Sequence, residues 1–126
     1  MAVTISPEDL SDAVQAALEE YGDLAKEVTR DTVRKVAKTC RQEIRAASPY
    51  RTGRYSKGWR VQETASHNGD VTETVYNAVA PGLTHLLEDG HATVNGGRVA
   101  GKAHIAPAEQ RAEANLLEGL ERELSL

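Results

Sequence analysis

Residues 96–103, Gly-Gly-Arg-Val-Ala-Gly-Lys-Ala, come close to the phosphate-binding loop of many ATPases. That loop has the pattern G-x-x-x-x-G-K-[ST], in which backbone N–H groups and the lysine hold phosphates and the hydroxyl holds magnesium. Gly96, Gly101 and Lys102 have this spacing, but Ala103 stands in place of the hydroxyl. The match therefore lacks the group that would hold the metal.

The surroundings of this segment do not favour a nucleotide site. A phosphate-binding loop follows a buried apolar strand and opens a helix. Here the preceding residues are weakly apolar, and Pro107 prevents a helix directly after Lys102. Asn95-Gly96 is instead a turn signal. We expect a glycine-rich hairpin or loop over residues 91–105 that binds no nucleotide, with Arg98 and Lys102 making its tip basic.

Three histidines and a carboxylate form a second candidate site, made of His85, Glu88, His91 and His104. Imidazoles and a carboxylate are zinc ligands, so a metal-dependent hydrolase is one hypothesis. Gly90 is expected to end a helix between Glu88 and His91, and the spacing matches no common zinc motif. We expect surface or turn histidines and no bound metal.

Nucleophilic catalysis has little support in this sequence. No serine lies in a G-x-S-x-G turn, and the single cysteine, Cys40, falls in a helical pattern with no obvious base beside it. Free cysteines are commonly buried, so we expect a packed, inert thiol. The sequence thus predicts no enzyme, no catalytic residue and no cofactor.

Charge is spread unevenly along the chain. The net charge is −4, yet five basic residues and no acidic residue lie between Glu43 and Glu63, which gives this stretch +5 and the remainder −9. Such a segment is either a solvated loop or strand edge, or a surface that faces phosphate or an acidic protein. An alternative function is therefore a nucleic-acid-binding module that uses residues 45–60, including Trp59, with strongly salt-dependent DNA binding. The basic residues are Arg45, Arg51, Arg54, Lys57 and Arg60.

The first element that positions these residues is a long helix over residues 6–48. Ser6 can cap it, Pro7 suits its first turn, and Pro49 ends it. Its pattern weakens at Gly22 and over residues 29–32, where a bend or break is possible. Forty helical residues span about 60 Å, so part of the helix must project or lie against another chain. Apolar residues recur in steps of mostly three and four at Leu10, Val14, Leu18, Tyr21, Leu24, Val28, Val36, Cys40, Ile44 and Ala47.

The remaining elements alternate between strand and helix patterns. Residues 55–80 predict a β-hairpin, with Asn68-Gly69 as its turn and Trp59 packed between sheet and helix. A short helix follows over 83–90 and ends at Gly90. A C-terminal helix over 107–124 carries an apolar stripe that docks on the sheet or meets another subunit. The predicted class is α+β, with a long N-terminal helix, a small antiparallel sheet built from hairpins, and a C-terminal helix on that sheet.

Composition limits the core of this 126-residue chain, which we expect to form one domain over 1–126. It has no Phe, one Trp and four Tyr, so the core must be lean and neighbouring subunits can contribute to stability. The N-terminal residues lack the basic flank and apolar stretch of a signal peptide, and no run is long enough to span a membrane. We expect a protein of the cytoplasm, or of a particle assembled there.

The order of these segments resembles a family of phage head–tail joining proteins. Its type member is the tenth gene product of the lambdoid phage HK ninety-seven, and members are called neck, tail-completion or minor tail proteins. The resemblance covers nearly the whole chain and rests on three motifs: "RTGRYSKGW", "LTHLLEDGH" and "AHIAPA". Asp89 stands where the family usually has an aromatic residue, and Ala103 and Ile105 flank His104.

The resemblance implies a structural protein of the virion neck without catalysis. It implies a homo-oligomeric ring, most simply a hexamer, between head-completion proteins and tail-terminator or tail-tube proteins. DNA would pass through the channel of this ring without specific binding, and no membrane is involved. Assembly would take place in the cytoplasm of the host bacterium. We expect the interface to use Arg45, Arg51, Arg54, Lys57, Arg60, Arg98 and Lys102.

Overall fold

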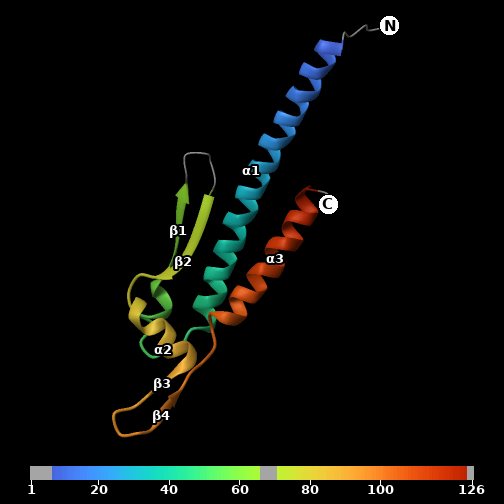
Figure 1. Cartoon of the computed structure of the whole chain (residues 1–126). Helices are drawn as coiled ribbons and strands as arrows, with labels where there is room; N and C mark the ends of the chain where they lie inside the picture. Colours follow the sequence, from blue (N-terminus) through green and yellow to red (C-terminus); the bar gives the residue numbers. More distant parts are fainter. Residues whose placement is uncertain (1–6, 66–70, 125–126) are drawn as a thin grey trace.

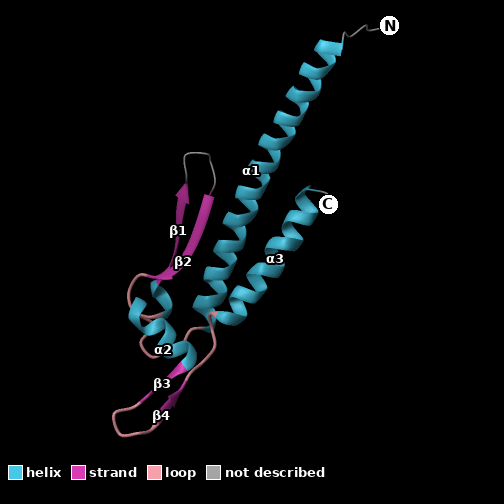
Figure 2. Ribbon diagram, in the orientation of Figure 1, coloured by secondary structure: helices cyan, strands magenta, loops and turns pink. Residues whose placement is uncertain are grey.

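The chain folds into three layers around its long first helix. A computed structural model describes residues 7–65 and 71–124. Helix α1 (Pro7–Ala47) lies between a hairpin of strands β1 (Trp59–Ala65) and β2 (Val71–Asn77) on one side and helix α3 (Ala106–Leu124) on the other (Figure 1). The short helix α2 (Thr84–Asp89) and a second small hairpin lie at the end far from the N-terminus (Figure 2).

Helix α1 is continuous over 41 residues. Gly22 and residues 29–32 do not break it. At the second place the hydroxyls of Thr29 and Thr32 donate to the carbonyls of Ala25 and Val28 at 2.7 and 2.8 Å, so these side chains bond within the helix itself. The N-terminal part of α1 extends well beyond α3 (Figure 1), as expected from its length. The predicted cap, Ser6, lies outside the described residues.

The first hairpin is antiparallel, as predicted. Trp59 pairs with Asn77 at its base and Ala65 with Val71 at its far end. It starts later than expected from the sequence, because Ser56–Gly58 form a 3-10 turn before β1. The predicted turn, Asn68-Gly69, lies outside the described residues.

The second hairpin is separate from the first. Strands β3 (Gly90–Ala92) and β4 (Arg98–Ala100) form their own two-stranded sheet directly after α2. Gly90 ends α2 with φ +82°, a conformation that side chains disfavour, so the predicted helix end is where the chain changes direction. The predicted single small sheet is thus two sheets, each built from one hairpin.

Helix α3 runs mainly along α1 and reaches the sheet through its first turns. The α+β class is confirmed. Ala108 is fully buried in the core beside Trp59 of β1, and a Cβ at Gly119 would meet Thr32 of α1. The small residue at 119 therefore permits the close approach of the two helices.

The core is small, as the composition predicts. Ile44, Trp59 and Ala108 form its buried centre, and Cys40, Tyr55, Val75 and Ile105 pack around it. Trp59 is only 3 % exposed and lies between helix and sheet, as predicted. Among the described residues, no helix is long and apolar enough to cross a membrane.

We predict that Trp59→Ala lowers the free energy of unfolding by about 3–5 kcal/mol, because a large buried ring leaves a cavity. Denaturant unfolding followed by circular dichroism measures this loss. Tyr50→Ala is the matched control, because that ring is 72 % exposed, and it should change stability far less. Equal losses in the two variants would contradict the placement of Trp59 in the core.

Candidate functional site

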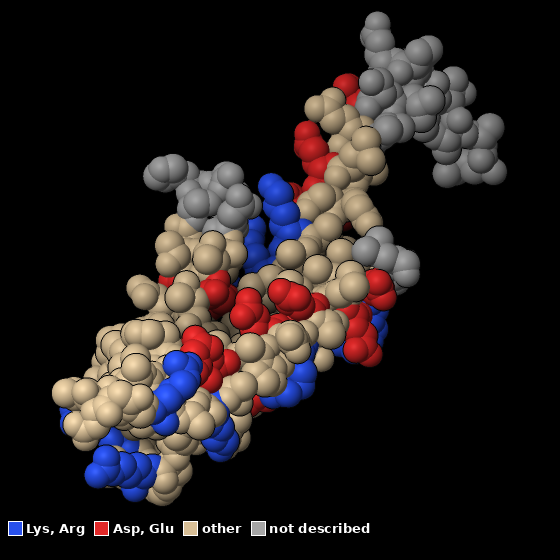
Figure 3. Space-filling view, turned by 60° about the horizontal axis from the view of Figure 1, so that its bottom comes forward, with Lys and Arg blue, Asp and Glu red and all other residues tan. Residues whose placement is uncertain are grey.

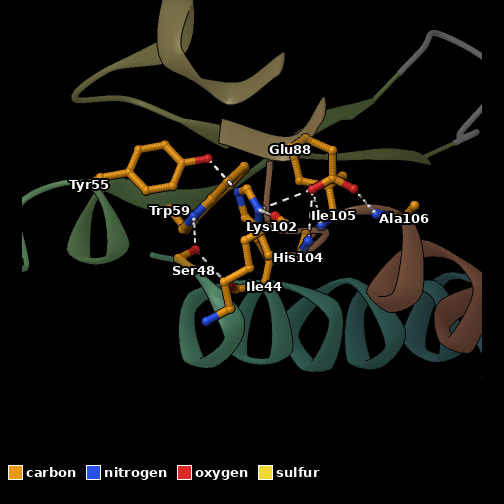
Figure 4. A network of polar contacts seen from close by, with 9 residues as sticks. All are labelled: Ile44, Ser48, Tyr55, Trp59, Glu88, Lys102, His104, Ile105 and Ala106. Carbon is orange, nitrogen blue, oxygen red and sulfur yellow. Dashed lines mark hydrogen bonds and ion pairs between the residues drawn. The ribbon is translucent and has the colours of Figure 1, made fainter. Parts of the chain in front are cut away.

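A polar network occupies the centre of the body, where α2, the end of α1 and the start of α3 meet (Figure 4). His104 is fully buried. Its Nδ1 lies 2.7 Å from the carbonyl of Lys102, which can only accept, so Nδ1 carries a proton and donates. Its Nε2 lies 2.7 Å from the hydroxyl of Tyr55. A neutral ring with its proton on Nδ1 accepts the Tyr55 hydroxyl at Nε2. Burial, with a contribution from the Glu88 charge, raises the pKa of Tyr55 to about 12, so the hydroxyl keeps its proton.

Glu88 accepts backbone N–H groups at the start of helix α3, although it precedes those residues by 16 to 18 positions in the sequence. Its Oε1 accepts the backbone N–H groups of His104 and Ile105 at 2.7 and 2.8 Å, and its Oε2 accepts that of Ala106 at 2.9 Å. Burial raises the pKa of Glu88, but these backbone donors lower it by more, so the pKa lies below its usual value. A negative charge also suits the positive end of the helix dipole.

Ring contacts and a hydroxyl join this network to the hairpin. Tyr55, Trp59 and His104 pack edge to face, with ring centroids 5.6–6.2 Å apart. The indole N–H of Trp59 donates to the Ser48 hydroxyl at 2.9 Å, and that hydroxyl donates to the carbonyl of Ile44 at 2.6 Å. The end of α1 is thereby fixed to the first residue of β1.

The predicted histidine cluster is only partly assembled. Glu88 and His104 meet at 3.0 Å, but His85 is exposed on α2 and His91 is half-buried on β3. Within residues 7–65 and 71–124, no group of three His, Cys, Asp or Glu side chains could hold a metal ion. The prediction that all of these histidines are surface or turn residues is wrong for His104, which is a core residue.

The glycine-rich segment serves backbone packing. Gly101 follows β4, and a Cβ there would collide with the carbonyl of Glu88 and the backbone nitrogen of Gly90. The N–H of Lys102 donates to the carbonyl of Leu87 at 2.8 Å, and α3 begins only at Ala106. Lys102 therefore lies at the base of the hairpin, which corrects its predicted place at the tip.

Arg98 also differs from its predicted place. It lies at the start of β4, and its guanidinium donates to the carbonyl of Asp89 at 3.0 Å, which directs it back toward α2.

The five basic residues of segment 45–60 are all exposed, but only two of them line one pocket. Arg51 and Arg54 border a pocket of about 360 Å³ between the loop after α1 and helix α2. Arg45 is on the last turn of α1, and Arg60 on β1 donates to the carbonyl of Lys57. Trp59 is buried, so it is not available to stack on a nucleic-acid base, which corrects that part of the nucleic-acid hypothesis.

Cys40 is half-buried and packs against the core. Burial, followed by the nearby charges of Glu43 and Glu109, raises the pKa of its thiol. A raised pKa reduces the thiolate fraction and so the reactivity, in agreement with the predicted inert thiol.

Sequence reasoning missed the capping role of Glu88 and the link from Tyr55 to His104. A signal for the first was present, because Ile105, immediately before α3, has no side-chain acceptor for the free N–H groups of the helix. Such a helix start requires an acceptor from elsewhere in the chain.

Comparison with known proteins found one family. The model of the HK97-gp10-like family, described as "Bacteriophage HK97-gp10, putative tail-component", matches residues 12–90. Neither the search of curated proteins nor that of solved structures found a match. The matched range includes most of α1, the first hairpin, α2 and Glu88.

We predict that Glu88→Gln lowers the free energy of unfolding at pH 7 by about 1.5–3 kcal/mol, because bonds to a charged acceptor are lost. The folded-state pKa is depressed, so this stabilisation is present above the unfolded pKa of about 4.3 and is lost as pH falls through the folded pKa. Denaturant unfolding at pH 7 and pH 3 measures it. The difference in free energy of unfolding between wild type and Glu88→Gln should shrink at pH 3. Glu113→Gln, at an exposed position, should show no such difference from wild type at pH 7.

We predict that Gly101→Ala destabilises the protein by about 1–3 kcal/mol, because its Cβ has no space between α2 and β3. Gly82→Ala is the control, since a Cβ at Gly82 meets nothing within 4 Å. Thermal unfolding compares the two. A Gly101→Ala protein as stable as the control would show that this glycine is not there for close packing.

Proposed function

Because the chain belongs to the HK97-gp10-like family of phage tail components, we propose that it is a structural subunit of the virion neck. It joins the head to the tail and completes the channel through which DNA passes. The observation that carries this proposal is the shape of α1. Its N-terminal part extends beyond the body and leaves Leu18, Tyr21 and Leu24 59–66 % exposed. Large apolar side chains exposed together mark surfaces for other proteins.

We propose that the subunits form a closed ring of six, in keeping with the symmetry of tails. The described core contains few buried apolar residues, so contacts with neighbours would add to the stability of each subunit. Its neighbours along the axis are head-completion proteins on one side and tail-terminator or tail-tube proteins on the other. The ring assembles in the cytoplasm of the host bacterium.

Charge supports a division between partner surfaces and channel wall. Segment 45–60 carries the exposed Arg51 and Arg54, and complementary charge steers association and sets register. The rest of the chain carries −9. Acidic walls do not hold phosphate, so they let DNA pass. In the space-filling view, some basic side chains lie at the end with the short hairpin and others lie beside α1 and along the middle, where the acidic side chains also lie (Figure 3).

The polar network supports a structural role over a catalytic one. His104 is fully buried, and both of its ring nitrogens have partners. Glu88 uses both carboxylate oxygens on backbone donors. Groups engaged in this way hold the helices together and cannot reach a substrate.

We predict that Arg51→Glu with Arg54→Glu blocks the joining of heads to tails and leaves the subunit folded, because both side chains are exposed. A phage with a disrupted copy of the gene is complemented with wild-type or variant protein. Infectious titre and electron microscopy then measure joined particles. Free heads and free tails should accumulate with the variant.

The control carries the same change in charge on another surface, Lys35→Glu with Lys38→Glu, two exposed positions of α1, and should give normal particles. Normal virions with the arginine variant would overturn the role of these arginines. Joined particles without any copy of the protein would overturn the neck function. A map of the neck with both arginines on the DNA would favour the nucleic-acid-binding alternative.

A further inference from the structure

The exposed part of α1 over residues 15–27, here called the arm, has an apolar ridge with two acidic residues along one edge. Leu18, Tyr21 and Leu24 are 66, 60 and 59 % exposed. They are spaced three apart, so they are neighbours along the helix surface. With 3.6 residues per turn, Glu20 and Glu27 lie beside Leu24 at the edge of this ridge, whereas Glu19, Asp23 and Lys26 lie on the opposite face of the helix.

The pocket at the other end of the molecule has the opposite charge. Arg51 and Arg54 border it, and apolar walls come from α2 and the residues before it. Of these wall residues, Leu83 is 45 % exposed and Val79 is 37 % exposed. The pocket, here called the arginine pocket, is lined by Pro49, Arg51, Thr52, Gly53, Arg54, Tyr55, Val79, Ala80, Leu83 and Leu87.

The residues that line the arginine pocket favour binding of a protein side chain over binding of a small polar ligand. A site for such a ligand presents convergent polar groups that need partners. In the described part of the chain, the buried side-chain atoms without a partner belong to Glu73 and His91, and neither residue lines this pocket. What it offers is an apolar wall with two cations at its edge.

Charge complementarity indicates which surface of the protein can bind in the arginine pocket. Two arms packed on each other would place like charges together, which is unfavourable. Helix α3 is also acidic, so it repels the arm as well. Within one subunit the arm and the arginine pocket lie at opposite ends (Figure 1). A chain therefore cannot fill its own pocket, and the complementary pair can form only between two copies.

We propose that the arm of one copy docks in the arginine pocket of the next copy. The ridge of Leu18, Tyr21 and Leu24 packs on the apolar wall, and Glu20 and Glu27 at the edge of the ridge face Arg51 and Arg54. Such a contact joins unlike surfaces, so it generates a ring when the rotation closes and a filament when it does not. The inference deepens the proposed neck function and depends on it only for closure into a ring.

Reciprocal charge reversal tests the contact in the purified full-length protein. The arm variant is Glu20→Lys with Glu27→Lys, and the pocket variant is Arg51→Glu with Arg54→Glu. Sedimentation velocity over a range of concentrations measures association. Each variant alone should associate about tenfold more weakly or worse than wild type. An equal mixture should recover association, because the basic arm then meets an acidic pocket and the acidic arm meets a basic one.

Two further variants separate this contact from effects of folding and total charge. Leu18→Gln with Leu24→Gln should weaken association and leave the unfolding transition unchanged, because both side chains are exposed. Glu113→Lys with Glu121→Lys makes the same change in charge on exposed positions of α3 and should associate as wild type does.

Three results would overturn the proposal. These are a wild-type protein that stays monomeric up to about 1 mM, a mixture that fails to recover, and an arm variant that binds wild type more tightly than wild type binds itself. The last result would indicate arm-to-arm pairing. Each of them leaves the neck function standing, because that function is tested by the joining of particles in the complemented phage.

Discussion

The body of this protein depends on one carboxylate that closes the start of a helix. The first N–H groups of α3 have no partner within the helix, and Ile105 provides no cap of its own. Glu88, at the end of α2, accepts the N–H of Ala106, the first residue of α3, with Oε2, and the N–H groups of His104 and Ile105 just before the helix with Oε1. Because one of these donors is the backbone of His104 itself, the same contact helps to hold the imidazole between Tyr55 and the carbonyl of Lys102. Loss of that charge would therefore loosen α2, α3 and the hairpin together.

A second constraint follows from the length of α1. A helix of 41 residues is about 60 Å long, and α3 with its 19 residues covers only about half of it. The uncovered arm keeps the same apolar periodicity as the covered part, so Leu18 and Tyr21 are exposed although their spacing is that of buried residues. This exposed apolar face supports the proposed contact of the arm with another copy of the chain.

Local patterns in the sequence predicted the elements well and their long-range partners less well. Periodicity and Pro49 predicted the extent of α1, and Trp59 was correctly assigned to the core. The 3-10 turn at Ser56–Gly58 was not predicted, because it is held by contacts of Tyr55 and Gly58 with Asn77 and Ala78 at the end of β2. The separation into two sheets was not predicted either, because single-sequence patterns do not show which hairpins pair. The buried His104 and the remote cap from Glu88 depend on contacts between distant segments, which spacing in a single sequence does not encode.

The chemistry of the chain is divided between its centre and its ends. At the centre, the titratable groups that could act on a substrate are buried and bonded to each other or to the backbone. At the ends, apolar and charged side chains that could stabilise the fold are exposed, with the acids on the arm and two arginines at the pocket. An enzyme needs accessible polar groups in a cleft, whereas a subunit of a closed assembly needs complementary surfaces on opposite sides. This distribution of buried and exposed groups supports the proposal that the chain is a subunit of such an assembly.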